Sequence, residues 1–171
     1  WVKDQPYTLG SSGFIGGAPA IMSANAVTGI CNEGQMLYRR ARESRDAATS
    51  FSYQSDWPEG KYETTLLFSE TYSNAVSARL FNVFIQGQQV LSNFDIYAAA
   101  GGANKAIVLT FTNTVSNGQL QIDFTGIPTQ FETNARVSAI RVRKIADPVF
   151  ESVPPTVTIT APLDGSTVAG T

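Results

Sequence analysis

The residues of this chain that could do covalent chemistry lack the partners that such chemistry needs. The 171-residue sequence contains no histidine and a single cysteine, Cys31. A nucleophilic serine or cysteine is usually activated by a neighbouring histidine, and histidine is also a common metal ligand. The sequence therefore excludes Ser-His-Asp and Cys-His catalysis, histidine-based metal sites and an internal disulfide. Cys31 is expected to be a small buried residue.

Pairs of carboxylates are the remaining route to catalysis, because glycoside hydrolysis needs two of them at a suitable separation. Glu70 with Asp95, or Glu43 with Asp46, would be candidate pairs, but nothing in their spacing distinguishes them among the 14 acidic residues. Glu70 is instead expected at a strand end with its hydrogen bonds satisfied, and Asp95 is expected to hold the following loop through backbone amides. We therefore predict that this domain is not an enzyme.

Three aromatic residues lie in predicted loops where a ring could stack on a sugar. Tyr72 follows a strand, Trp57 lies in the turn 56–60, and Phe131 lies in a loop rich in amide and hydroxyl groups, 128–134. An aromatic face packs on the C–H face of a pyranose, while polar side chains orient its hydroxyls. The alternative for Trp57 is a turn residue folded onto the edge of the fold, and for Tyr72 and Phe131 it is a purely structural role.

Alternating apolar and polar residues dominate from residue 36 onward and predict strands joined by short turns. The clearest strands are expected at 61–68, 80–86, 107–112, 119–124 and 140–143. The run 80–86 is apolar on both faces, which predicts a central strand covered on two sides. The pair Asn117-Gly118 predicts a hairpin between 105–115 and 118–125. Many short strands and no long amphipathic helix indicate an all-β fold, an antiparallel β-sandwich, with irregular loops in the Gly-, Ser- and Ala-rich segment 8–34.

Charge and hydropathy exclude two classes of partner. The net charge is −2 and only 15% of the residues are charged, so the chain lacks the basic surface that nucleic acid or an anionic membrane requires. Four arginines within 39–45 are expected to form a solvated strand end and loop rather than a binding patch. No run of about 18 apolar residues is present to span a membrane.

Four segments follow one another along the chain: KYETTLLFSETY (61–72), RLFNVFIQG (79–87), FDIYAAAGGANK (94–105) and NARVSAIRV (134–142). Together they resemble the core signature of malectin domains, a family of carbohydrate-binding modules. The resemblance covers residues 1–145 and implies a β-sandwich of jelly-roll type that binds a glycan without catalysis. Trp1-Val2-Lys3-Asp4 resembles the second landmark of the family, which implies that the family's first strand is missing from this chain.

The resemblance also implies a sugar site at one end of the sandwich, built from loop aromatic residues and a few polar side chains. Tyr72 occupies the family's aromatic position after a strand, and the next position, often aromatic in the family, is Ser73. Glu43 stands where another family aromatic residue closes the segment 37–43, and Phe14 is the nearest candidate for a third.

By position, the family's acidic residue before the last strand becomes Thr133, followed by a matching Asn134. The expected carbohydrate-binding residues are Phe14, Glu43, Trp57, Tyr72, Ser73, Phe131, Thr133 and Asn134. Tyr72 and the long loops favour a lectin-like binding module for a polysaccharide or oligosaccharide. The reduced set of aromatic residues favours the alternative, a structural or adhesive spacer that contacts protein neighbours.

The end of the sequence indicates a second unit. Residues 146–155 contain Pro154-Pro155 and are expected to be a linker, and 156–171 resemble the first strand and turn of a bacterial immunoglobulin-like repeat. We therefore expect an extracellular or cell-surface bacterial protein with several neighbouring domains, in which any glycoside hydrolase or other catalytic domain lies elsewhere. No cofactor is expected, and a structural calcium ion is left unassigned because no Asp-x-Asp-x-Asp run is present.

Overall fold

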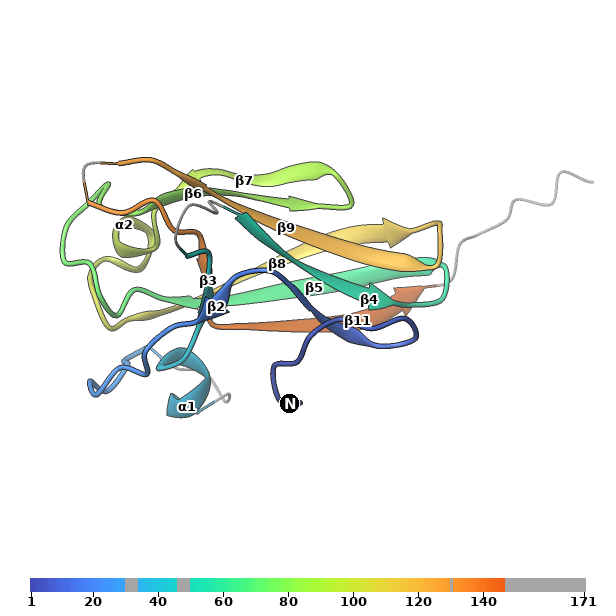
Figure 1. The fold of residues 1–171 in the computed structure, drawn as a ribbon, viewed down its shortest axis with the longest axis horizontal. Helices are drawn as coiled ribbons and strands as arrows, with labels where there is room; N and C mark the ends of the chain where they lie inside the picture. Colours follow the sequence, from blue (N-terminus) through green and yellow to red (C-terminus); the bar gives the residue numbers. More distant parts are fainter. Residues whose placement is uncertain (30–33, 46–49, 130, 147–171) are drawn as a thin grey trace, which may run out of the picture.

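Alternating apolar residues form facing antiparallel sheets in the computed structural model, which describes residues 1–29, 34–45, 50–129 and 131–146 (Figure 1). In chain order the elements are β1 (Ser12–Ile15), β2 (Ala18–Pro19), α1 (Gln35–Tyr38), β3 (Arg42–Glu43), β4 (Ser50–Asp56), β5 (Gly60–Ser69), β6 (Leu80–Ile85), β7 (Gln88–Phe94), α2 (Ile96–Ala100), β8 (Ala106–Val115), β9 (Gln119–Ile127), β10 (Arg136–Val137) and β11 (Ala139–Ala146). The prediction of an all-β antiparallel sandwich is confirmed.

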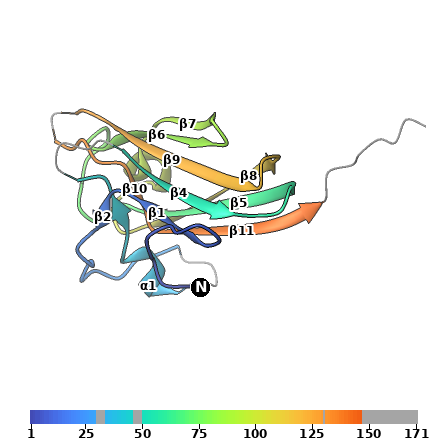
Figure 2. The same cartoon turned by 45° about the vertical axis from the view of Figure 1, so that its right-hand side comes forward.

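Two main sheets form the layers of the sandwich. One has five strands in the order β1-β4-β9-β6-β7, and the other has three in the order β11-β5-β8. Figure 2 shows the five-stranded sheet above the three-stranded one, with α1 beneath the latter. A small third sheet, β10-β3-β2, lies near the end of the sandwich where β5 and β9 finish.

The core fills the space between the two main sheets. Every second side chain of β6 and β9 is buried, which is the period expected of strands with one inner face. The rings of Phe51 and Phe124 stack with centroids 4.8 Å apart, and Phe68 packs against both Phe81 and Phe94. Strand β5 is buried on both faces, because Leu67 points away from this core into a second cluster with Val27 and Tyr38.

Strand β6 differs from its prediction on one face. It lies between β9 and β7, as a central strand should, but its outward residues Leu80 and Phe84 are only half-buried. Among the described elements, the main packing partners of the two short helices are β5 and β8. The predicted cover on the second side is therefore wrong, because the helices that supply cover belong to the opposite sheet.

The predicted hairpin around Asn117-Gly118 is also wrong. Strand β8 pairs with β5, whereas β9 pairs with β4 and β6, so the turn carries the chain from one sheet to the other. Gly118 does adopt the positive φ of 74° that such a turn requires. The inward residues of the two strands therefore face each other across the core instead of lying side by side.

Three further expectations concern single segments. Arg42 is buried rather than solvated, which corrects the prediction for part of the arginine cluster, because its guanidinium contacts the ring of Phe14. Cys31, Asp46 and the whole of 147–171, including the expected immunoglobulin-like start, lie outside the described residues. In the described part of the chain, no helix has the length and apolar character needed to cross a membrane.

Candidate functional site

Two irregular segments, 70–79 and 128–135, meet at the end of the sandwich where β5 and β9 finish, on the left in Figure 1. A buried ion pair closes the first segment on itself: Nε of Arg79 lies 2.8 Å from Oε2 of Glu70, and the two side chains are only 3% and 1% exposed. Arg79 also donates from Nη1 to the carbonyl oxygen of Asn134 at 3.1 Å and lies 4.0 Å from the carboxylate of Glu132. The arginine thus links the loop after β5 to the loop after β9.

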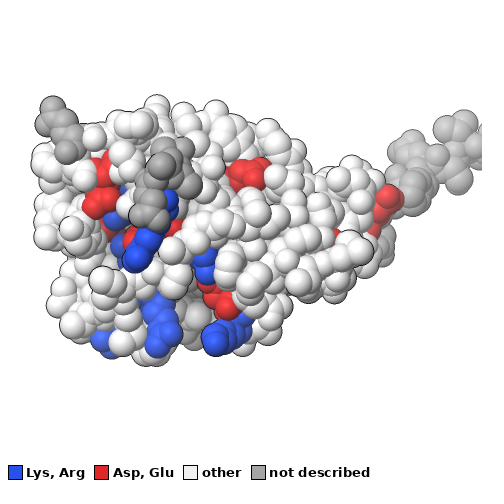
Figure 3. All heavy atoms as spheres, viewed as in Figure 1, with Lys and Arg blue, Asp and Glu red and all other residues white. Residues whose placement is uncertain are grey.

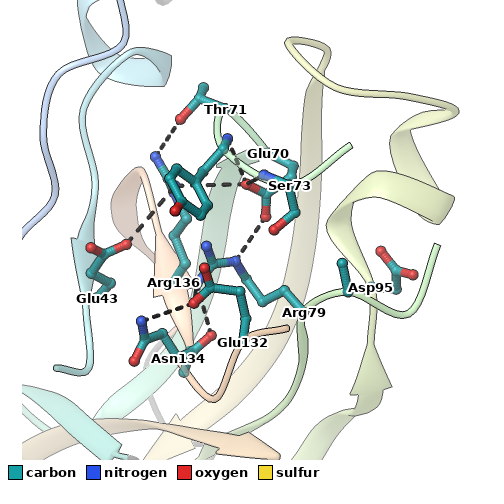
Figure 4. Close-up of polar contacts among 12 residues, drawn as sticks. Glu43, Glu70, Thr71, Ser73, Arg79, Asp95, Glu132, Asn134 and Arg136 are labelled. Atoms are coloured by element: carbon teal, nitrogen blue, oxygen red, sulfur yellow. Dashed lines mark hydrogen bonds and ion pairs between the residues drawn. The ribbon is translucent and has the colours of Figure 1, made fainter. Parts of the chain in front are cut away.

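A second buried arginine extends this network to the small third sheet (Figure 4). Nη1 of Arg136, in β10, lies 3.8 Å from Oε1 of Glu70 and 3.9 Å from Oε2 of Glu43, in β3. Its Nη2 donates to the hydroxyl of Thr71 at 2.6 Å. We call Glu43, Glu70, Arg79, Glu132 and Arg136 the loop-end ion network.

The chain turns sharply after β5 because Glu70 accepts hydrogen bonds from its own downstream backbone. Its Oε1 accepts from the amides of Tyr72 at 2.9 Å and Ser73 at 3.0 Å. This turn leaves Tyr72 72% exposed, while Ser73 is buried. The prediction that Glu70 lies at a strand end with its hydrogen bonds satisfied is confirmed.

The loop after β9 is held by a hydroxyl and by a glycine. Thr129 donates its hydroxyl to the carbonyl oxygen of Ala78 at 2.7 Å and accepts from the amide of Glu132 at 2.9 Å. The returning chain passes so close to Gly126 that a Cβ there would lie 1.9 Å from the carbonyl oxygen of Thr133. Only glycine allows this approach, which sets the position of the loop over the end of β9.

Glu70 keeps its negative charge at neutral pH although it is buried. Burial alone would raise the pKa of Glu70, but the charges of Arg79 and Arg136 and the two backbone amides outweigh it and hold the pKa below its usual value. Burial lowers the pKa of Arg136, an effect that the neighbouring Glu70 opposes. The buried groups therefore form a fixed, mutually compensated set of charges.

Above these buried charges lies a surface that combines rings with hydrogen-bonding groups. Phe131, like Tyr72, is 72% exposed. The carboxylates of Glu43 and Glu132 are 13% and 15% exposed, and Nδ2 of Asn134 donates to Glu132 at 3.2 Å. We call these five residues the loop-end surface.

The structure brings six of the eight predicted site residues to this end of the sandwich. Four of them, Glu43, Tyr72, Phe131 and Asn134, are on the surface itself. Ser73 lies beneath it with its hydroxyl buried, whereas Thr133 is half-buried and packs over β9 through its backbone.

Trp57 is not part of this group. It lies in the turn between β4 and β5, at the opposite end of the ten-residue strand that leads to Tyr72. Its ring packs edge-on against Tyr62, with centroids 5.4 Å apart, and is half-buried. The alternative interpretation, a turn residue folded onto the edge of the sandwich, agrees with this position.

Phe14 is also separate from the surface. The guanidinium carbon of Arg42 lies 3.2 Å from the centroid of its ring, and Arg42 is held in place by Asp4 at 2.9 Å. Because neighbouring residues of a strand point to opposite faces, Phe14 lies on the other side of β3 from Glu43. Its ring is covered by an arginine and serves the packing of the N-terminal segment.

Arg79, Arg136 and Glu132 are the residues that reasoning from sequence missed. Both arginines lie among apolar residues at the start of a strand. Arg79 lies in the run ARLF (78–81), and Arg136 lies in the run ARV (135–137). A charged residue in such a position must find a partner, because an unpaired buried charge is costly. That rule could have identified both arginines, although it would not have named their partners.

The structure does not bring the candidate carboxylates of Glu70 and Asp95 together. Asp95 lies apart from Glu70 in Figure 4 and caps α2, accepting from the amide of Ala98 at 3.1 Å as well as from Ser77. This confirms that Asp95 holds its loop through backbone amides. Within 1–29, 34–45, 50–129 and 131–146, no group of three or more acidic, histidine or cysteine side chains could hold a metal ion.

Comparison with known proteins gives relatives of two kinds. Two probable leucine-rich repeat receptor-like serine/threonine-protein kinases of Arabidopsis thaliana are each 34% identical, over 127 and 119 residues, which are 68% and 62% of this chain. The chain spans only 11% and 12% of their lengths. Their kinase names therefore describe proteins of which this chain matches only a small part.

Solved structures share the fold. The β-glucuronidase of Bacteroides uniformis superimposes with a TM-score of 0.68 at 24% identity, over 85% of this chain and 16% of that one. The extracellular domain of ANXUR2 from Arabidopsis thaliana superimposes with a TM-score of 0.62 at 16% identity, over 75% of this chain and 39% of that one. The family model of the Malectin domain matches residues 18–149, which is most of the chain. The chain therefore belongs to the malectin domain family.

Proposed function

We propose that this domain binds a glycan non-covalently through the loop-end surface. The observation that carries the proposal is the placing of two exposed rings, Tyr72 and Phe131, beside carboxylates that buried arginines hold in position. Rings supply apolar contact to the C–H face of a sugar, and fixed acceptors select the orientation of its hydroxyls. Membership of the malectin family supports the same function.

The accessible polar groups favour a neutral sugar over an acidic one. The two arginines of the network are only 2–3% exposed, so a ligand would meet the more accessible carboxylates of Glu43 and Glu132 first. A uronic acid would bring its own negative charge against them, although the exposed Arg45, 3.4 Å from Glu43, reduces that repulsion. Glu43 also takes the place of a family ring, so acceptor hydrogen bonds replace part of the stacking.

We expect weak binding, with dissociation constants of roughly 1 μM to 1 mM, because a small hydrated ligand makes few contacts. The domain would act without catalysis and without a cofactor, as one part of a longer extracellular protein. Because this chain matches only a small part of each kinase relative, they support its being one part of a longer protein. The likeness to the extracellular domain of ANXUR2 fits an extracellular location. A bacterial source and a glycoside hydrolase partner stay predictions, and the curated relatives are plant proteins.

The test is affinity electrophoresis of the 171-residue chain through gels containing α-glucan, β-glucan, galactan or a uronic acid polymer. We expect retardation by a neutral polysaccharide, and a loss of affinity of about five- to thirtyfold in Tyr72→Ala and in Phe131→Ala, equivalent to about 1–2 kcal/mol per stacked ring. Trp1→Ala is the matched control, since it removes another exposed ring, 61% accessible, that is not on the loop-end surface.

Two outcomes would contradict the proposal. Binding that survives both ring variants would place the site elsewhere on the domain. Failure of every polysaccharide to retard the folded protein would favour the second candidate, a spacer that contacts neighbouring proteins. The observation favouring that candidate is the loss of two family ring positions, since Glu43 has no ring and Ser73 is buried.

A further inference from the structure

The outer face of the five-stranded sheet carries a row of side chains that the loop-end surface does not use. Residues paired directly across antiparallel strands point to the same face of a sheet. The ladder places Ile15 opposite Ser52, Ser52 opposite Asp123, and Asp123 opposite Phe84, so these four residues form one row across β1, β4, β9 and β6. With strands about 4.8 Å apart, the row is about 14 Å long.

Beside this row the surface is hollowed. A hollow of about 390 Å³ is lined by Ile15, Gly16, Ser50, Phe51, Ser52, Asp123 and Thr125. Its volume lies within the range of about 300–1,000 Å³ that small-molecule sites occupy. A second ladder row, Ser50 opposite Thr125 and Thr125 opposite Asn82, adds hydroxyl and amide groups alongside it.

The chemistry of this face is that of hydroxyl recognition. None of the five strands contains a lysine or arginine, and Asp56 and Asp123 are their only acidic residues. The carboxylate of Asp56 already accepts hydrogen bonds from the hydroxyl of Tyr7 at 2.9 Å and from the side-chain amide of Gln119 at 3.0 Å. Asp123 receives one side-chain hydrogen bond, from Gln121 at 2.9 Å. Figure 3 shows the surface over β4 and β9 as largely uncharged, with an isolated acidic patch.

We propose that this outer face is a second glycan-binding site, for a neutral oligosaccharide laid across β1, β4, β9 and β6. Asp123 accepts hydrogen bonds from sugar hydroxyls, the hydroxyls of Ser52 and Thr125 bond neighbouring groups, and Phe84 and Ile15 supply apolar contact at the two ends of the row. This site lies on the outer face of the five-stranded sheet, whereas Tyr72 lies in the loop after β5 of the other sheet. The proposal does not depend on sugar binding by the loop-end surface.

A protein partner fits this face less well. Protein interfaces depend on a centre of large apolar or aromatic side chains that become fully buried. Ile15 is the only large hydrophobic residue of the five described strands that is exposed, at 45%, and Phe84 is already half-buried. A neutral oligosaccharide needs little apolar area and many hydroxyl partners, which is what the two rows offer.

The test uses the ¹⁵N-labelled 171-residue chain and four neutral probes, namely maltohexaose, cellohexaose, xylohexaose and mannohexaose, each at up to about 10 mM to reach millimolar affinities. We expect at least one probe to shift the backbone amide signals of Ser52, Asp123 and Thr125. Asp123→Ala should weaken this binding about tenfold, and Phe84→Leu about threefold. Gln88→Ala, an exposed change on β7 of the same sheet, should leave the binding unchanged.

The loop-end variant Tyr72→Ala separates this proposal from the proposed function. Outer-face shifts that persist in Tyr72→Ala support a second site, even if the loop-end surface binds nothing. Outer-face shifts that disappear in Tyr72→Ala, or no such shifts with any of the four probes, would overturn it. A change of sedimentation in Asp123→Ala with no loss of sugar-induced shifts would instead assign the face to a protein contact and would also overturn it.

Discussion

Glu70→Gln tests whether the loop-end ion network holds this end of the sandwich together. The side chain is 1% exposed and lies 2.8 Å from Arg79 and 3.8 Å from Arg136. Glutamine keeps the size of the side chain and an oxygen that can accept the backbone amides of the following turn, so the substitution removes mainly the charge. It leaves two buried arginines without their shared partner.

The expected cost follows from that geometry. Removing one partner of a buried pair typically destabilises a protein by about 3–5 kcal/mol. Glu132, 4.0 Å from Arg79, and Glu43, 3.9 Å from Arg136, still compensate part of the positive charge. We therefore expect the lower end, a loss of about 3 kcal/mol in the free energy of unfolding, or about 6–12 °C in Tm.

Glu63→Gln is the matched control, because Glu63 lies in β5, the strand that ends just before Glu70, and forms a solvent-exposed pair with Arg143 at 3.1 Å. The two side chains are 30% and 67% exposed, so this pair should contribute about 1 kcal/mol or less. Urea unfolding followed by circular dichroism and by tryptophan fluorescence gives both free energies. A difference of less than about 1 kcal/mol between the two variants would refute the structural role of the network, leaving Thr129 and the backbone to hold the loops.

Three other predictions concern the same end of the molecule and its neighbours. The pKa of Glu70 in the folded state lies below the value of 4.5 expected when it is exposed. The stabilisation by its charge is therefore complete above about pH 5 and is lost as the pH falls through the folded-state pKa. The difference in unfolding free energy between the native chain and Glu70→Gln should be constant from about pH 6 to 8 and shrink below pH 4.5. Gly126→Ala should lower the free energy of unfolding by about 1–3 kcal/mol and weaken glycan binding, because its methyl group would displace Thr133. Its control, Gly118→Ala, has open space around the new methyl group and should cost only about 1 kcal/mol of backbone strain, with binding unchanged. Equal effects of the two variants on binding would contradict this prediction. Phe14→Leu should lower the free energy of unfolding by about 0.5–2 kcal/mol, because it removes the ring that lies 3.2 Å from the guanidinium of Arg42. Titration calorimetry should find the affinity for sugar unchanged, and a loss of affinity would return Phe14 to the binding site.

The strands of this fold could be predicted from sequence because their signal is local. Leu120, Ile122 and Phe124 alternate with polar residues, and all three are buried in β9. The strands with which a given strand pairs cannot be predicted from this local signal. Asn117-Gly118 specifies a positive φ and a reversal of the chain, but strands on either side of such a turn can pair in one sheet or face each other across a core. Both arrangements bury the same alternate residues, so the sequence pattern does not distinguish them.

The exposed residues of the candidate site can be proposed from sequence, whereas the ion pairs beneath them cannot. Tyr72 is a candidate because it is a ring directly after a strand end. Arg79 and Arg136 act through contacts that join 70 to 79 and 43 to 136, and no local pattern shows which acidic residue each will meet. What the sequence does show is a charge embedded among apolar residues, which requires a partner without naming it.

In the proposed function, the network compensates for the smaller number of rings. The segments that carry Tyr72 and Phe131 have no regular secondary structure, and ordering such segments during binding costs about 0.5–1.5 kcal/mol for each side chain that becomes fixed. Here the ordering is done during folding, because Glu70 fixes the turn before Tyr72 while Arg79 ties that turn to the backbone of Asn134. Loss of the network should therefore weaken sugar binding even at temperatures where Glu70→Gln is fully folded and no sugar contact has been removed. If the folded variant binds as tightly as the native chain, the loops are ordered by the ligand and not by the ion network.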